Sequence, residues 1–186
     1  MLGGPEDEKR LKITHRIVQE ETKQALMKED VTKVKVVLEK LLREFNSILN
    51  AVRKNDDSYE NFCDLIPHAK TLINEAKTMD LIIKERAMLI VVLGWHYRKT
   101  GDDEQALDYW TELLNNQKLI NALDSTNLFK ARLLQKISKA YINLEGEENI
   151  RKGLRSAEDC LQIFQRDFPR NHKEIGLVFS YMGNAY

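Results

Sequence analysis

The chain has 186 residues, and its 29 basic residues balance its 29 acidic residues, so its formal net charge at pH 7 is zero. This balance provides no global electric field that would attract nucleic acid or an acidic membrane, so we expect neither as a partner. A chain of this length forms one sizeable core, and a composition with three prolines, eight glycines and 31% charged residues is typical of a helix-rich soluble protein.

Residues 1–30 are predicted to form an N-terminal helix. It begins at Pro5, because proline is preset for the first turn of a helix. The acidic residues Glu6, Asp7 and Glu8 follow directly and complement the positive end of the helix dipole. The apolar residues of this segment form only a weakly amphipathic pattern.

Residues 31–86 are predicted to be a helical region, which we treat as a candidate degenerate repeat. Its first helix has an apolar stripe in which spacings of three and four residues alternate: Val31, Val34, Leu38, Leu41, Phe45, Ile48 and Val52, widened by Val37, Leu42 and Leu49. A stripe this broad favours packing within a bundle, since the seam of a two-stranded coiled coil is narrower. A coiled-coil dimer remains the alternative.

The rest of this region is read from its turn and cap residues. Asp57 and Glu60 are spaced as a capping box at the start of the second helix. Pro67 predicts a kink or a restart, because it has no backbone donor. Asp80 is expected to cap the helix that follows. The packing face of the segment after Pro67 is predicted to consist of Ala69, Ile73 and Ala76.

The turn at residues 100–102 separates two further helices. Gly101 is suited to the left-handed conformation that ends a helix, and Asp102 is suited to cap the next one. Because helix follows helix with short turns, we predict an all-α fold built from antiparallel helical hairpins.

Three helices share one apolar pattern that recurs at intervals of about 44 residues. The matching sets are Ile90, Leu93, Gly94 and Tyr97, then Leu134, Ile137, Ser138 and Tyr141, then Phe179, Met182, Gly183 and Tyr186. Two second helices also agree, with Ala106, Trp110 and Leu113 matching Ala157, Leu161 and Phe164. The small residues at 94, 138 and 183 therefore predict equivalent close helix crossings, faced by Ala106 or Ala157.

These residues resemble the tetratricopeptide repeat (TPR), whose first helix reads large-x-x-Leu-Gly-x-x-Tyr and whose second reads Ala-x-x-x-aromatic. Residues 87 to about 116 match this pattern, and residues 131–169 match it with Pro169 at the expected end. The last stretch, "NHKEIGLVFSYMGNAY", is similar to the start of a longer-period repeat, such as those of kinesin light chains. The resemblance assigns residues 87–186 to TPR-like repeats, the last one truncated, and implies an α-solenoid with a right-handed superhelix.

The chain departs from the family pattern in two respects. Leu113 and Phe164 stand where a small residue is usual, which affects the helix spacing. About seven extra residues around Glu145 to Asn149 are expected to lengthen the turn of the second repeat.

In an array of this kind the first helices line a concave groove. The stripe beside their packing face is the candidate peptide-binding site: Trp95, Arg98, Arg132, Gln135, Lys139 and Asn184, with Lys99, Lys136 and Asn143 at its margin. Basic and amide groups around an aromatic side chain suit a peptide or helix with acidic groups and one apolar residue. The alternative is that these are ordinary solvated residues of a helix face.

The sequence contains no pattern typical of an enzyme. The four histidines, His15, His68, His96 and His172, are scattered, and no Cys-x-x-Cys pair is present, so we expect no metal site. No glycine-rich phosphate loop or Gly-flanked serine elbow occurs, so we expect neither a cofactor nor catalysis.

Cellular placement is inferred from the cysteines and from the apolar runs. The longest apolar run, Met88–Leu93, is far shorter than the roughly 20 residues that cross a bilayer. Cys63 and Cys160 lie far apart, each on an apolar helical face, so we expect reduced, buried thiols and a cytoplasmic protein.

The predicted function is a non-enzymatic protein–protein interaction scaffold that binds a partner peptide or helix in the groove. Two alternatives stay open: a helical oligomerisation or spacer module that uses the stripe from Val31 to Val52, and a regulatory helical domain of a larger protein. The last helix presents apolar residues with no second helix to cover them, which predicts self-association through that helix.

Overall fold

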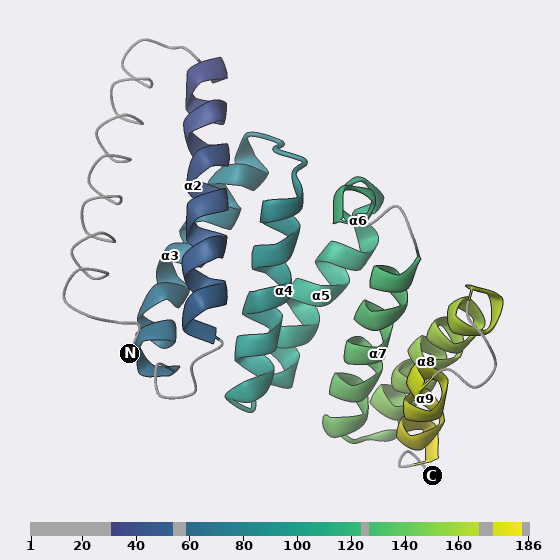
Figure 1. Ribbon diagram of the computed structural model, residues 1–186. Helices are drawn as coiled ribbons and strands as arrows, with labels where there is room; N and C mark the ends of the chain where they lie inside the picture. Colours follow the sequence, from purple (N-terminus) through teal and green to yellow (C-terminus); the bar gives the residue numbers. More distant parts are fainter. Residues whose placement is uncertain (1–30, 54–58, 124–126, 168–172, 184–186) are drawn as a thin grey trace. The chain divides into compact units, whose positions relative to one another are not determined.

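The computed structural model describes residues 31–53, 59–123, 127–167 and 173–183 (Figure 1). Every regular element in these ranges is an α-helix, so the predicted all-α class is confirmed: α2 (Val31–Arg53), α3 (Tyr59–Thr78), α4 (Lys84–Lys99), α5 (Asp103–Asn115), α6 (Gln117–Leu123), α7 (Leu128–Asn143), α8 (Glu147–Asp167) and α9 (Lys173–Gly183). The helix predicted for residues 1–30 and the capping box of Asp57 and Glu60 lie outside the described side chains. The chain divides into two compact units, Met1–Leu89 and Ile90–Tyr186.

In the first unit, α2 packs against α3 through a stripe of buried side chains: Val34, Leu38, Leu42, Phe45 and Leu49. The prediction of a buried stripe on α2 is therefore confirmed, but the stripe is centred on a slightly different side of the helix from the predicted one. Leu42 and Leu49, expected at its edge, are almost completely buried, whereas Leu41 and Ile48 are half-buried. Val31 is 61% exposed, so its assignment to the packing face was wrong.

A buried asparagine joins α2 to the first turn of α4 within this unit. The side-chain amide of Asn46 donates to the carbonyl oxygens of Leu42 and Glu85, each at 2.8 Å. Arg43 places its Nε 3.6 Å from the carboxylate of the same Glu85. Since a buried amide needs partners, these contacts specify where α4 begins against α2.

Helix α3 corrects two predictions. It continues from Tyr59 to Thr78 with Pro67 inside it, so Pro67 does not restart the helix. Asp80 has a φ of 50° and ends α3 instead of capping α4. Its N–H donates to the carbonyl oxygen of Lys77, and the N–H of Leu81 donates to that of Ala76, which is the Schellman pattern. The predicted packing face of α3, Ala69, Ile73 and Ala76, is confirmed as buried.

The end of α4 uses the same device with the expected residues. Gly101 has a φ of 85°, and the N–H of Asp102 donates to the carbonyl oxygen of Tyr97 at 2.8 Å. Asp102 then caps α5 by accepting from the N–H of Gln105 at 3.0 Å. Both cap predictions at this turn are confirmed.

In the second unit, the part of α4 that begins at Ile90 forms an antiparallel hairpin with α5. Trp110 of α5 is completely buried and lies against Gly94, where an added Cβ would collide with the indole ring. The indole Nε1 also donates to the carbonyl oxygen of Val91 at 3.4 Å. Gly94 therefore accommodates the ring of Trp110.

Helices α7 and α8 form the next hairpin, and they lie side by side in Figure 1. Here the close approach depends on Gly153 of α8, where an added Cβ would lie 3.1 Å from the carbonyl oxygen of Ser138. The surroundings of Gly183 differ again, because no atom lies within 4 Å of an added Cβ there. The prediction of three equivalent crossings at 94, 138 and 183 is therefore wrong.

The extra residues of this hairpin extend a helix instead of a turn. Helix α7 ends at Asn143 and α8 begins at Glu147, so the turn between them has the same length as the one between α4 and α5. The prediction of a longer turn is wrong because Gly146, with a φ of 81°, allows α8 to begin at once.

Two further helices complete the second unit. Helix α6 was not predicted; Asn116 caps it by accepting from the N–H of Leu119 at 3.1 Å. Helix α9 packs on α7 and α8 through Ile175 and Val178, whereas Phe179, expected to face inward, is 53% exposed. The buried cluster shared by α7, α8 and α9 consists of Ala131, Leu134, Ala157, Cys160, Phe164, Ile175 and Val178.

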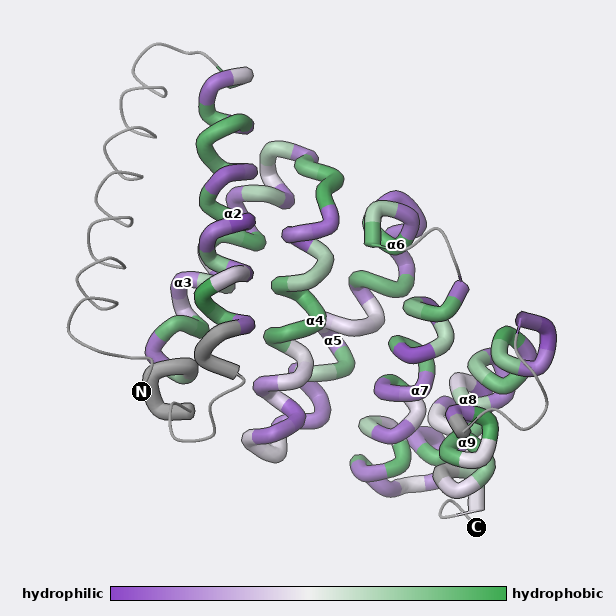
Figure 2. Tube along the Cα trace, in the orientation of Figure 1, coloured by the Kyte–Doolittle hydropathy of each residue, from purple (hydrophilic) through white to green (hydrophobic). Residues whose placement is uncertain are grey.

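The hydropathy of α4 changes sharply along its length (Figure 2). The run Met88–Leu93 is hydrophobic without interruption, and the C-terminal end of the helix is hydrophilic. Helix α4 has therefore little solvent-facing surface in its middle and a polar end, and Trp95 lies where the two parts meet.

Candidate functional site

Five of the six predicted groove residues lie on α4 and α7, beside the buried packing face, and the side-chain amide nitrogen of Gln135 is itself buried. Ile90, Leu93, Leu134 and Ile137 are buried, as the pattern requires of the packing face. Arg132 is exposed, and the side chains of Trp95, Arg98, Gln135 and Lys139 are half-buried. Asn184 lies outside the described residues.

Trp95 and Trp110 have opposite environments. Trp110 is completely buried, whereas Trp95 reaches the surface in part. The ammonium group of Lys99 lies 5.3 Å from the centroid of the Trp95 ring, within the range of a cation–π interaction. Because Lys99 covers one face of this ring, a partner would contact the remaining edge and face or displace the ammonium group.

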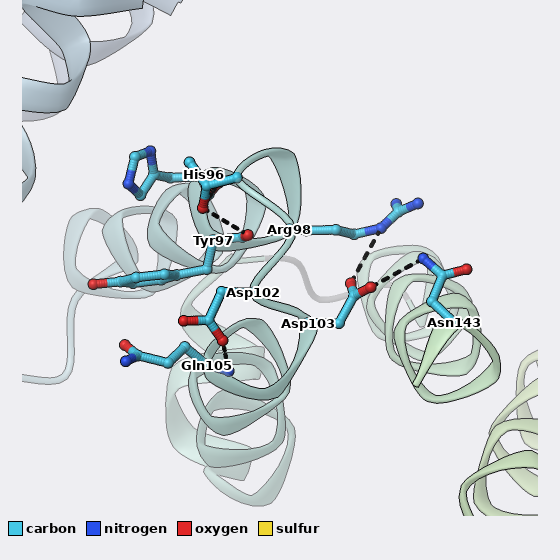
Figure 3. Close-up of polar contacts among 8 residues, drawn as sticks. His96, Tyr97, Arg98, Asp102, Asp103, Gln105 and Asn143 are labelled. Carbon is cyan, nitrogen blue, oxygen red and sulfur yellow. Dashed lines mark hydrogen bonds and ion pairs between the residues drawn. The ribbon is translucent and has the colours of Figure 1, made fainter. Parts of the chain in front are cut away.

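Arg98 and Asn143 share one carboxylate (Figure 3). The Nε of Arg98 lies 3.8 Å from Oδ1 of Asp103, and the amide of Asn143 donates to Oδ2 of the same side chain at 3.0 Å. Asp103 is the first residue of α5, while Arg98 and Asn143 lie at the C-terminal ends of α4 and α7. This contact brings the two solvent-facing stripes together at one end.

Arg132 is paired within the chain. Its guanidinium lies 3.5 Å from the carboxylate of Glu174 in the first turn of α9, and the Glu174 side chain is only 12% exposed. Arg132 is itself 52% exposed, so the contact leaves much of its side chain accessible. The predicted site residue Arg132 therefore also has a structural contact between α7 and α9.

Charge is segregated between the neighbouring helices α5 and α7. Helix α7 contains four basic residues and no acidic one: Lys130, Arg132, Lys136 and Lys139. Helix α5, which packs against it, contains four acidic residues and no basic one: Asp103, Glu104, Asp108 and Glu112. The net neutrality of the chain therefore hides a basic face on α7, where Arg132, Lys136 and Lys139 share the side opposite the core.

Cys160 is a structural thiol that is buried as expected, whereas Cys63 is only half-buried, so its predicted burial was wrong. Burial raises the pKa of Cys160 to about 12, the negative charge of Glu174 acts in the same direction, and a backbone hydrogen bond at Gln135 opposes them. Its Sγ donates to the carbonyl oxygen of Ala131 at 3.1 Å. A thiol held in its neutral form is a poor nucleophile, so this cysteine is not suited to catalysis.

The described part of the chain has no group of three or more His, Cys, Asp or Glu side chains that could hold a metal ion. Within the same residues, no helix combines the length and the apolar character needed to span a membrane.

Asp103 is the residue of this site that sequence reasoning missed. As an acidic residue in the first turn of α5, it complements the helix dipole, and that role alone does not indicate a contact with another helix. A signal was present: a three-residue turn through Gly101 places the first residue of one helix beside the last turn of the previous one, where Arg98 lies.

Comparison of the sequence with protein-family models gave no match, and comparison with curated proteins gave none either. The assignment of a function therefore rests on the residues themselves.

Proposed function

We propose that this chain is a non-enzymatic protein–protein interaction scaffold, a TPR-like right-handed array of helical hairpins, that binds an acidic peptide or helix against its first helices α4 and α7. The observation that supports this most directly is the basic, acid-free face of α7, which continues through the shared Asp103 contact to the partly exposed Trp95. The thiol of buried Cys160 suits a reducing compartment such as the cytoplasm.

The typical binding energies of ion pairs and of buried aromatic side chains assign different roles to the charged and apolar groups of the site. Exposed ion pairs contribute about 0.2–1 kcal/mol each, so Arg132, Lys136 and Lys139 together favour an acidic partner without giving tight binding. A buried aromatic anchor contributes about 2 kcal/mol or more. We therefore expect Trp95 to supply most of the affinity and the basic face to supply selectivity and speed of association.

The oligomerisation alternative has less support from the packing of α2. The stripe that would pair two chains is covered by α3 within the same chain, from Val34 to Leu49. Two apolar residues of α2 are exposed, Val31 at the start of the predicted stripe and Val36 beside it, and neither belongs to the buried part of the stripe.

The test uses a short fluorescein-labelled peptide of alternating Glu and Ser residues around one central Leu, which we call the Glu peptide. The control, its Gln twin, is the same peptide with every Glu replaced by Gln. We expect fluorescence anisotropy to show binding of the Glu peptide only, and Trp95→Ala or Lys139→Glu to weaken it about tenfold.

Arg155→Glu is the matched control, since Arg155 is exposed on α8 and the substitution changes the net charge equally. The proposal fails if the peptide does not bind. It also fails if Trp95→Ala and Lys139→Glu leave the affinity unchanged, or if Arg155→Glu weakens binding as much as they do.

A further inference from the structure

Building on the proposed function, we infer that Asp103 is a positioning residue: it orients the Arg98 guanidinium so that its two terminal nitrogens meet a carboxylate or phosphate group of the partner. The contact that supports this joins three helices, because Asp103 of α5 lies between Arg98 of α4 and Asn143 of α7.

The Asp103 carboxylate is itself held in place. Its Oδ2 accepts from the Asn143 amide at 3.0 Å, and its side chain is only 12% exposed. The other oxygen, Oδ1, faces Nε of Arg98 at 3.8 Å. A carboxylate that is fixed by a neighbouring helix and shielded from water can hold the longer arginine side chain in one orientation by its charge.

The guanidinium of Arg98 uses only one of its edges in this contact. Figure 3 shows both terminal nitrogens on the far side of Nε from the carboxylate. Nε is buried, yet the side chain is 27% exposed, so the accessible surface belongs to other atoms of Arg98. Two parallel N–H groups at a guanidinium edge match the two oxygens of a carboxylate or phosphate.

The distance of 3.8 Å shows what kind of contact Asp103 makes. It exceeds the roughly 2.7–2.9 Å of a charge-assisted hydrogen bond. Within the described residues, neither Nε of Arg98 nor Oδ1 of Asp103 has a hydrogen-bond partner. Asp103 therefore directs Arg98 by charge and leaves its hydrogen-bonding capacity for the partner's anionic group.

A positioning role and a purely electrostatic role of Asp103 predict opposite effects of Asp103→Asn on the affinity for an acidic peptide. Removal of a negative charge beside an anion site strengthens binding of an acidic peptide if only the local field matters. If Asp103 orients Arg98, the same substitution releases the guanidinium, and the acidic peptide binds about tenfold more weakly. Glu104→Gln supplies the control, because it removes an exposed negative charge one residue away and outside the cluster.

The experiment measures anisotropy of the Glu peptide, its Gln twin and a phosphoserine version with the wild type and four variants: Asp103→Asn, Asn143→Ala, Arg98→Lys and Glu104→Gln. We expect the first three to reduce the preference for Glu over Gln while each protein keeps the helical circular dichroism of the wild type. A larger loss with the phosphoserine peptide identifies phosphate as the preferred anion, and a larger loss with the Glu peptide identifies carboxylate.

Two results would separate this inference from the proposed function. If the Glu peptide binds and Trp95→Ala abolishes binding, but Asp103→Asn strengthens it as Glu104→Gln does, the positioning role is refuted and the docking face stands. If no acidic peptide binds the wild-type chain at all, the docking face itself is refuted.

Discussion

The hairpins α4–α5 and α7–α8 reach the same kind of close packing with the small and large residues exchanged. In the first hairpin the glycine is on the first helix, and Gly94 accommodates the Trp110 ring. In the second the glycine is on the second helix, and Gly153 approaches Ser138 and Tyr141. What recurs between the hairpins is a glycine at a point of close approach, not the helix on which that glycine lies.

The largest expected difference between the hairpins follows from removing the buried ring. Trp110→Ala should lower the free energy of unfolding by about 3–5 kcal/mol, because the Trp110 side chain is completely buried and its indole N–H donates to Val91. Leu161 is the matching residue of α8 and is only half-buried, so Leu161→Ala should cost clearly less. Urea unfolding followed by circular dichroism gives both values, and equal losses would show that the hairpins are packed alike.

A smaller effect of definite sign is expected at the glycines. Gly94→Ala should destabilise the protein by about 1–3 kcal/mol, because the added methyl group collides with a fully buried ring. Gly176→Ala is the control in α9, where an added Cβ meets open space. Alanine favours a helix over glycine by about 0.5–1 kcal/mol, so this change should stabilise. Thermal unfolding checks the signs, and a neutral Gly94→Ala would contradict the packing described for Trp110.

Local roles could be predicted from the sequence, because they depend on one residue type and its neighbours. Gly101 and Asp102 perform the turn and cap functions that their chemistry favours. Asp80 was misassigned because aspartate is common both as an N-cap and, less often, in the left-handed conformation. The choice between them depends on Leu81, whose burial fixes the end of α3, and burial depends on tertiary packing.

The candidate site was predictable in part for the same reason. Periodicity alone placed Trp95 and Lys139 outside the core, since it needs only the spacing along one helix. It could not find the contacts of Asp103 with Arg98 and Asn143, because they join three helices through the geometry of a turn. Nor could it show that Gly153 provides the close approach that Ser138 was expected to provide.

The smallest expected effect concerns the pH dependence of stability, in which the buried polar groups of Trp110 and Cys160 differ. Trp110 and Cys160 each donate to a carbonyl oxygen of the facing first helix, but only the thiol of Cys160 can ionise in the alkaline range. The pKa of Cys160 is raised from 9.0 to about 12, mainly by burial, so the folded chain keeps this proton at pH values where the unfolded chain loses it. Stability from this group is therefore complete below about pH 9 and falls as the pH rises toward 12.

The measurement compares how steeply the free energy of unfolding falls with pH in the wild type and in Cys160→Ala, because other groups of the chain also titrate at alkaline pH. The free energy of unfolding of the wild type should fall by about 1 kcal/mol more than that of Cys160→Ala between pH 8 and pH 10. Parallel slopes for the wild type and Cys160→Ala would mean that the thiol is hydrated in the folded chain. In that case the core shared by α7, α8 and α9 would be open to water, unlike the closed packing around Trp110.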